Sequence, residues 1–233
     1  MHRSVQRTIW LLTAMLFGSL MMMLNTPKGA TAWETAAPES AGFDPRFESR
    51  LEHEIETGAL NGLHGVVGRR HGKVVLDRYL SGHDQRWGDD LCEIAFGPEV
   101  LHDLRSISKS VVGLLYGIAL TQGRVPTLDA RLVDHFPYDD LKTDPARRGI
   151  EVRHALTMTI GLDWDESLPY IDARNSEVAM EMAEDRYHYI LSRPVVAAPG
   201  STWTYSGGST ALLAHLIARG SGQSLHDLAR EQL

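Results

Sequence analysis

Three hydroxyls and one ammonium open an apolar stretch near the middle of the chain. Residues 104–120 read LRSISKSVVGLLYGIAL, so Ser106, Ser108 and Ser110 surround Lys109. Ser106 and Lys109 stand three positions apart and share one face of a helix. At the first turn the Ser106 oxygen would lie near free backbone N–H groups, which stabilise an alkoxide or an oxyanion. Loss of hydration favours the neutral amine of a lysine, which is a base. The spacing therefore predicts a nucleophile and its base.

The same residues also fit a purely structural role. Ser106 could cap the helix, and Lys109 could extend along its surface to water. However, the run that begins at Val111 is apolar on every side, which predicts a helix buried in the core and leaves the lysine little room to reach solvent. This placement favours the chemical interpretation.

Tyr205 is a candidate for moving protons to a leaving group. It lies in the stretch TYSGG, after a Pro-Gly turn, and the glycines at 207 and 208 permit close approach of a ligand or another segment. A tyrosine beside an ammonium can act as a general acid or base. The alternative is an ordinary core tyrosine at the end of a strand.

Other motifs point to no metal and no cofactor. The sequence has no G-x-S-x-G, no H-E-x-x-H, no G-x-G-x-x-G and no Walker loop. Asp134-His135 with Asp139-Asp140 forms an acidic loop that we interpret as solvated. Cys92 is the only cysteine, so no internal disulfide can form, and nothing around it favours a thiolate.

The first 32 residues have the pattern of a secretory signal peptide. Arg3 and Arg7 precede an apolar stretch over 9–24, and Ala-Thr-Ala at 30–32 offers a cleavage site. The alternative is an uncleaved anchor helix, for which the apolar stretch is short. We therefore expect a secreted or periplasmic protein without stable membrane anchoring after cleavage.

The remaining residues, 33–233, form an acidic chain long enough for one domain with a real core. They carry 20 basic and 30 acidic residues, which gives a net charge of −10. Such a charge disfavours binding to nucleic acid or to an anionic membrane.

The pattern of residues predicts many helices and few strands. Strands are expected over 65–70 and 73–79, joined as a hairpin, and 81–103 and 126–145 are expected to be loops and turns. Helices are expected over 45–57, from the serine cluster to about 122, and over 150–158, 177–191 and 209–219, with a last one opening at 224–227. A lone hairpin is marginally stable, so the sequence predicts either a mostly helical protein with a β-flap or, as we favour, further strands beyond residue 233.

Two short motifs carry a resemblance to a known family. Ser106-Ile107-Ser108-Lys109 and Tyr205-Ser206-Gly207 resemble the first two motifs of the serine β-lactamase and penicillin-recognising superfamily. Within that superfamily, the chain resembles most the class C-like branch, which includes esterases, D-aminopeptidases and 6-aminohexanoate-dimer hydrolases. HGVVGRRHGKVVLDRYLSG, IEVRHALTMTIGLDW and RPVVAAPGSTWTYSGG also resemble segments of that branch in the expected order.

The resemblance implies an α+β fold, in which an antiparallel sheet with flanking helices joins a helical region. It implies that Ser106 is the acyl-enzyme nucleophile, Lys109 its base and Tyr205 the proton relay. The backbone N–H of Ser106 would form half of an oxyanion hole. The family's third motif, of K-T-G or H-x-G type, would lie beyond residue 233. On this view 33–233 is the N-terminal part of a hydrolase domain, here with one hairpin and mostly helices, and the 233-residue chain alone is expected to be inactive.

The resemblance favours an exported serine hydrolase that cleaves a small-molecule ester or amide without a cofactor. Gly207 stands where the branch's β-lactamases have asparagine, and the missing amide argues against efficient β-lactam turnover. A β-lactamase or D,D-peptidase remains the alternative enzyme. A non-catalytic protein that binds a peptide or wall fragment remains the alternative of another class. Gly207, Trp164 and Tyr170 are candidate substrate-binding residues, and the last two could line an apolar acyl pocket or serve in ordinary packing.

Overall fold

The computed structural model describes residues 33–86 and 89–233, and the chain divides into two compact units, Met1–Asp103 and Leu104–Leu233. The predicted signal peptide, residues 1–32, lies outside the described residues. Within the described part of the chain, no helix combines the length and the apolar character needed to cross a membrane. Each unit contains its own set of elements, and the two are described in turn.

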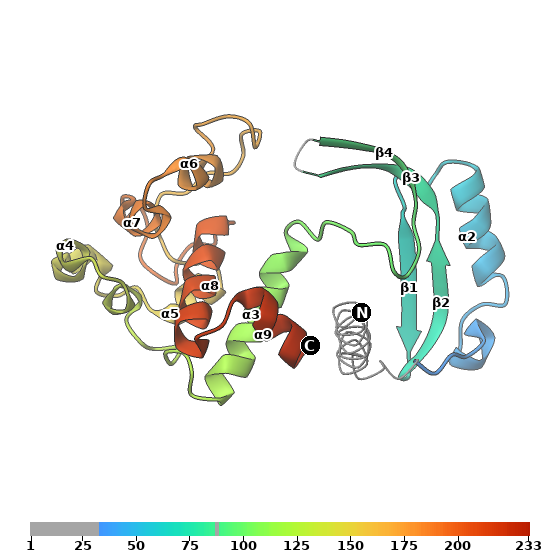
Figure 1. The fold of residues 1–233 in the computed structure, drawn as a ribbon, viewed down its shortest axis with the longest axis horizontal. Helices are drawn as coiled ribbons and strands as arrows, with labels where there is room; N and C mark the ends of the chain where they lie inside the picture. Colours follow the sequence, from blue (N-terminus) through green and yellow to red (C-terminus); the bar gives the residue numbers. More distant parts are fainter. Residues whose placement is uncertain (1–32, 87–88) are drawn as a thin grey trace, which may run out of the picture. The chain divides into compact units, whose positions relative to one another are not determined.

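The first unit consists of two antiparallel hairpins and a helix (Figure 1). The short 3₁₀ helix η1 (Pro38–Ala41) precedes α2 (Phe47–Glu56), and the strands are β1 (Gly65–Arg70), β2 (Lys73–Tyr79), β3 (Ser81–Arg86) and β4 (Asp89–Ala95). The β1–β2 hairpin is confirmed, because His71 and Gly72 turn the chain with φ angles of 51° and 82°, both in the left-handed region that tight hairpin turns need. Helix α2 lies beside β2, where Arg78 pairs with Glu52 at 2.7 Å.

The loop prediction for 81–103 was wrong over 81–86 and 89–95, which form strands. β3 pairs with β4 as a second antiparallel hairpin, so the described chain has two hairpins and not one. Most side chains on both strands are exposed, and β3 reads SGHDQR, without an alternating apolar face. A strand that buries neither face gives no periodic signal in the sequence. Backbone pairing defines this hairpin, and His83 of β3 also lies 2.8 Å from the Asp90 carboxylate of β4.

The second unit is a cluster of short helices around two longer ones (Figure 1). The two longer helices are α3 (Ile107–Thr121) and α8 (Gly207–Ser221), and α8 packs against both α3 and the short helix α5 (Val152–Leu156). The others are η2 (Leu132–His135), α4 (Asp139–Thr143), η3 (Pro145–Arg147), α6 (Ser176–Met182), α7 (Arg186–Ser192) and α9 (Leu225–Gln232).

Four of the expected helical and loop regions differ in the structure. The single helix over 177–191 is two helices, α6 and α7, because Asp185 caps α7 by accepting from the N–H groups of Tyr187 and His188. The 150–158 helix is shorter, and 126–145 contains η2, α4 and η3 between its turns. Helix α8 continues past Gly220 and ends at Ser221, and the following Gly222, with a φ of 69°, provides the left-handed cap.

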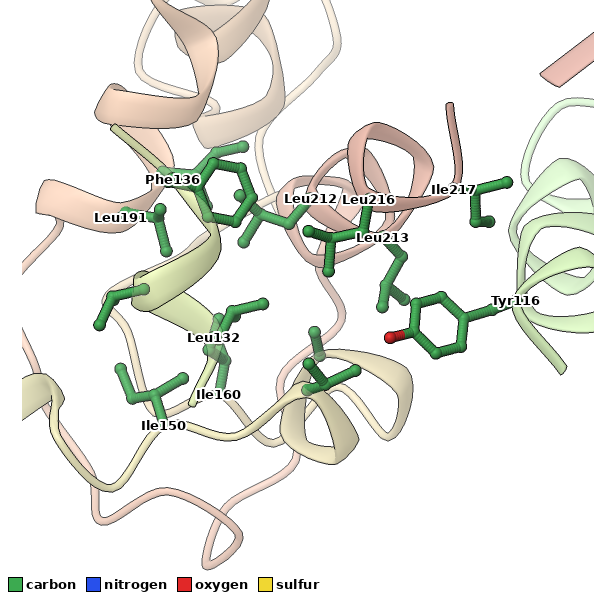
Figure 2. Close-up of a cluster of buried hydrophobic side chains, with 14 of the residues drawn as sticks. Tyr116, Leu132, Phe136, Ile150, Ile160, Leu191, Leu212, Leu213, Leu216 and Ile217 are labelled. Atoms are coloured by element: carbon green, nitrogen blue, oxygen red, sulfur yellow. The ribbon is translucent and has the colours of Figure 1, made fainter. Parts of the chain in front are cut away.

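The core of this unit lies where α8 meets α3 and the segments that follow it. Figure 2 shows Tyr116 of α3 facing leucine and isoleucine side chains of α8, with η2 and the residues around Ile150 and Ile160 close by. The α8 residues Leu212, Leu213, Leu216 and Ile217 recur at helical spacing and are buried. Burial also raises the pKa of Tyr116 to about 12, and its hydroxyl donates to the carbonyl of Pro126 at 2.8 Å.

Helix α3 is buried on one face within this chain. Leu115, Tyr116 and Ala119 are each 1 % exposed, whereas Ile107 and Leu114 are 64 % and 55 % exposed. The expectation of burial on every side is therefore wrong for the described residues. The buried face is the one that α8 covers, and it fixes the direction in which the first turn of α3 presents its polar side chains.

Asn175 connects α6 to the loop before it. Its side chain is fully buried, accepts from the N–H of Glu177 at 2.9 Å and donates to the carbonyl of Leu168 at 2.7 Å. The amide thus caps the helix and holds the preceding loop at the same time.

Replacing Asn175 by alanine should lower the free energy of unfolding by about 2 kcal/mol, because it removes the cap and takes the side-chain donor from the half-buried carbonyl of Leu168. Urea unfolding followed by circular dichroism measures the loss. Asn61→Ala is the control, since Asn61 is exposed, and it should change stability by less than about 0.5 kcal/mol. Equal stability of Asn175→Ala and the wild type would contradict this role.

Candidate active site

Ser106 lies at the very start of α3. It occupies the N-cap position, yet its side chain makes no capping hydrogen bond to the helix. Its Oγ is therefore available for other partners, and the alternative of a capping serine is not what the structure has. The residue before it, Arg105, has a φ of 47°, which a non-glycine residue adopts rarely and at some cost in energy. This conformation turns the chain into the helix at the serine.

Tyr205 is held just before the start of α8. The N–H of Thr204 donates to the carbonyl of Met158 at 2.9 Å, and the N–H of Gly200 donates to that of Thr159 at 2.8 Å. On the other side, Ser206 caps α8 by accepting from the N–H of Ser209 at 3.0 Å. Fixed backbone on both sides leaves the tyrosine ring little freedom of position.

The three predicted catalytic side chains meet at the Ser106 oxygen. The hydroxyl of Tyr205 donates to Ser106 Oγ at 2.6 Å, although the residues are 99 positions apart. Lys109 Nζ donates to the same oxygen at 3.4 Å and lies 5.0 Å from the centre of the Tyr205 ring. Lys109 is half-buried. An oxygen flanked by an amine and a phenol has both a group to take its proton and a group to return one.

A half-buried carboxylate, Glu166, accepts hydrogen bonds from three donors next to this group. Its Oε1 accepts from the backbone N–H of Gly207 and from the indole N–H of Trp164, each at 2.6 Å. Its Oε2 accepts from the hydroxyl of Tyr170 at 2.9 Å. Burial alone would raise the pKa of Glu166, but the hydrogen bonds, above all that with Glu177, outweigh it and lower the pKa. Glu166 thereby fixes the first residue of α8, two positions after Tyr205.

Glu177, on α6, is the second carboxyl group of this cluster. Burial raises its pKa to about 7, and the neighbouring Glu166 carboxylate adds to the effect, while the positive charge of Lys109 opposes it. Its Oε2 is buried, and no donor reaches it from the described residues. Two carboxyl groups so placed cannot both hold a negative charge easily, so the pair retains a proton near neutral pH.

The absence of a side chain at Gly207 has a direct structural reason. A Cβ on this residue would lie 2.6 Å from the carboxyl carbon of Glu177 and within contact of both its oxygens. The carboxyl group therefore lies against the Gly207 backbone, in space that any larger residue would need. This explains why the third position of the Tyr205-Ser206-Gly207 motif carries no amide.

The predicted substrate-binding residues have different surroundings. Trp164 is 6 % exposed and packs against Gly208 and Ile190, so the structure places it in the core beneath the start of α8. Tyr170 is 58 % exposed and attached to Glu166 through its hydroxyl. Gly207 contributes its N–H to Glu166.

Sequence reasoning missed Glu166 and Glu177. They lie 11 positions apart on a loop and a short helix, and neither belongs to a spaced motif. The one available signal was the glycine at 207, since a missing side chain leaves room for another group. Nothing in the sequence identified which group fills it.

A metal site was not expected, and one histidine pair bears on that expectation. Within the described residues of the first unit, His64, Asp84 and His102 bring potential ligand atoms within 4.8 Å of one another. However, His64 Nδ1 and His102 Nε2 are 2.7 Å apart, a hydrogen-bond distance, and Phe96 stacks on both rings. Two nitrogen ligands of one tetrahedral zinc lie about 3.3 Å apart. The spacing is that of two imidazoles sharing a hydrogen bond.

Comparison with solved structures gives the same fold from several sources. FmtA from Staphylococcus aureus superposes with a TM-score of 0.57 at 17 % identity, over 88 % of this chain and 51 % of its own. EstCE1, a hydrolase with promiscuous acyltransferase activity, superposes with a TM-score of 0.56 at 21 % sequence identity. The match covers 81 % of this chain and 49 % of EstCE1. The D-amino acid amidase from Ochrobactrum anthropi superposes with a TM-score of 0.53 at 20 % sequence identity. The match covers 80 % of this chain and 48 % of the amidase. This chain thus spans about half the length of each.

The family of the chain follows from its sequence match. The model of the family described as Beta-lactamase matches residues 47–233, which is most of the chain and includes Ser106, Lys109 and Tyr205. The fold of the structural neighbours agrees, and the α+β class predicted from the sequence is confirmed. The chain belongs to the β-lactamase family.

Proposed function

We propose that this chain carries the nucleophile of a serine hydrolase that cleaves small esters or amides through an acyl-Ser106 intermediate. The observation that carries the proposal is the convergence of Tyr205 Oη and Lys109 Nζ on Ser106 Oγ, at 2.6 and 3.4 Å. An exported location and the absence of a cofactor belong to the same proposal.

The geometry supports a two-step reaction. Ser106 Oγ attacks the carbonyl carbon of the substrate as its proton passes to the neutral amine of Lys109. The tetrahedral intermediate then collapses, the bond to the leaving oxygen or nitrogen breaks, and Tyr205 donates the proton that the leaving group needs. Tyr205 recovers a proton from Lys109. In the second step a water molecule attacks the acyl carbon by the reverse route and releases the acid.

The surroundings of Gly207 favour an ordinary ester or amide over a β-lactam. A β-lactamase of the class C-like pattern uses an asparagine amide at this position, and here the carboxyl of Glu177 takes the space instead. EstCE1, described as a hydrolase with acyltransferase activity, and a D-amino acid amidase share the fold. Both descriptions name transfer or cleavage of an acyl group, the step that Ser106 is placed to perform.

Replacing Ser106 by alanine should abolish covalent labelling by a fluorophosphonate probe. The wild-type product of the full reading frame should gain the mass of one adduct, because only an activated hydroxyl attacks the phosphorus at a useful rate. Intact-mass spectrometry measures it. Ser108→Ala is the matched control, since Ser108 is also exposed in the first turn of α3 and should label normally. Unchanged labelling of Ser106→Ala would refute the nucleophile, and a folded wild type that never labels would favour a binding protein.

Replacing Lys109 by alanine, or Tyr205 by phenylalanine, should slow release of p-nitrophenol from p-nitrophenyl acetate by about 100-fold or more, the usual contribution of a general acid or base. Both variants should retain the wild-type circular dichroism spectrum. Lys142→Ala is the control, because this lysine lies on α4 and pairs with Asp139 at 3.2 Å. Rates within a factor of two of wild type for Lys109→Ala would show that another group takes the serine proton.

A further inference from the structure

The two carboxyl groups beside Ser106, Lys109 and Tyr205 transfer no proton in the proposed acylation steps. Glu166 already has donors on both oxygens, from Gly207, Trp164 and Tyr170. Glu177 has one buried oxygen that no donor reaches. A buried acceptor without a donor is unfavourable, and a proton placed between the two carboxyl groups removes that cost.

The proton is not isolated from the catalytic residues. The Glu177 carboxyl lies against the backbone of Gly207, and the positive charge of Lys109 acts on it. Four titratable groups face it from the elements packed around it: Glu166 and Tyr170 from the loop before α6, Glu181 from α6 itself, and Lys109 from α3. Of these, Lys109 alone carries a positive charge, and Glu181 is exposed and paired with Arg186.

We propose that Glu177 is a positioning residue for the proposed hydrolase, which shares one proton with Glu166 and thereby sets the pH range in which Lys109 can accept the proton of Ser106. While Glu166 and Glu177 share the proton, the pair carries one negative charge, and Lys109 is attracted by that one charge only. When the proton leaves, a second negative charge stabilises the ammonium form of Lys109, and an ammonium cannot act as a base. The raised pKa of Glu177, about 7, places this change in the neutral range.

The sign of the effect follows from the same charges. The rate of acylation with a lysine as the base rises with pH, because the neutral amine becomes more abundant. Ionisation of Glu177 opposes that rise and shifts it toward higher pH. A variant that keeps the hydrogen bond to Glu166 but cannot ionise should therefore react faster between pH 7 and pH 9 than the wild type.

The test compares Glu177→Gln with Glu181→Gln in the product of the full reading frame. The rate of p-nitrophenol release from p-nitrophenyl acetate is followed from pH 5.5 to pH 9.5, and kcat and KM are separated. We expect Glu177→Gln to move the midpoint of the rise in kcat down by roughly one pH unit, a typical effect of one nearby charge, with KM little changed. Glu181→Gln should move the midpoint of the rise in kcat by no more than about 0.3 pH units.

A second readout does not depend on activity. The pKa of Glu177 is raised in the fold, from 4.5 to about 7, so the folded state binds more protons than the unfolded state between these values. Wild-type stability should therefore fall relative to Glu177→Gln as the pH rises from 4.5 to 7, and the difference should level off above 7. Urea unfolding of the two proteins across this range measures it.

The outcomes separate the two proposals. Failure of Ser106-dependent acylation at every pH overturns the proposed function, while the stability difference still tests the shared proton. Superposable pH profiles for wild type and Glu177→Gln in an active enzyme overturn the present inference alone. Equal shifts in Glu177→Gln and Glu181→Gln also overturn it, because they would reflect a general field and not the carboxyl pair.

Discussion

The hydrogen bond from Tyr205 to Ser106 depends on how the second unit packs α8 against α3 and holds the segment before α8. Its partners come from the starts of α8 and α3 and are 99 positions apart in the chain, and the bond is 2.6 Å long. Such a distance requires two helix ends to be placed within a fraction of an ångström. The packing of α8 against Tyr116 and the rest of the buried face of α3 sets the distance between the two helices (Figure 2). The backbone hydrogen bonds from Gly200 and Thr204 to Thr159 and Met158 hold the segment that carries Tyr205.

The second constraint is electrostatic. The start of α8 is fixed by a carboxylate, Glu166, which accepts from the Gly207 N–H. A negative charge at the N-terminus of a helix is favourable, but here it lies close to a lysine that must be neutral to act as a base. Placing a second carboxyl group beside the first would worsen the conflict if both were charged. A shared proton resolves it, since the pair then bears one charge and still supplies its hydrogen bonds.

Much of this arrangement was predictable from the sequence, for identifiable physical reasons. The spacing of Ser106 and Lys109 fixed their common face, and the Pro-Gly turn before Tyr205 marked the start of a second element. The β1–β2 hairpin was predictable because His71-Gly72 can adopt left-handed backbone conformations at both positions. These features are local, and local patterns are what a sequence expresses directly.

The features that were missed depend on tertiary contacts. The β3–β4 hairpin buries neither of its faces, so it leaves no apolar alternation, and the division between α6 and α7 depends on one capping aspartate at 185. Trp164 reads equally well as a pocket residue or as a core residue, and only the fold places it beneath Gly208. The carboxyl pair joins a loop to a helix 11 positions later, and no periodicity relates the two residues.

The most direct test of the account is to capture the acyl group on its residue. The product of the full reading frame would be mixed with p-nitrophenyl butyrate, quenched in acid within milliseconds to seconds, and analysed by intact and peptide mass spectrometry. We expect a single butyryl group on the peptide that contains Ser106, which forms with the release of p-nitrophenol and then decays. Release of p-nitrophenol with no adduct, or with the butyryl group on another residue, would contradict it.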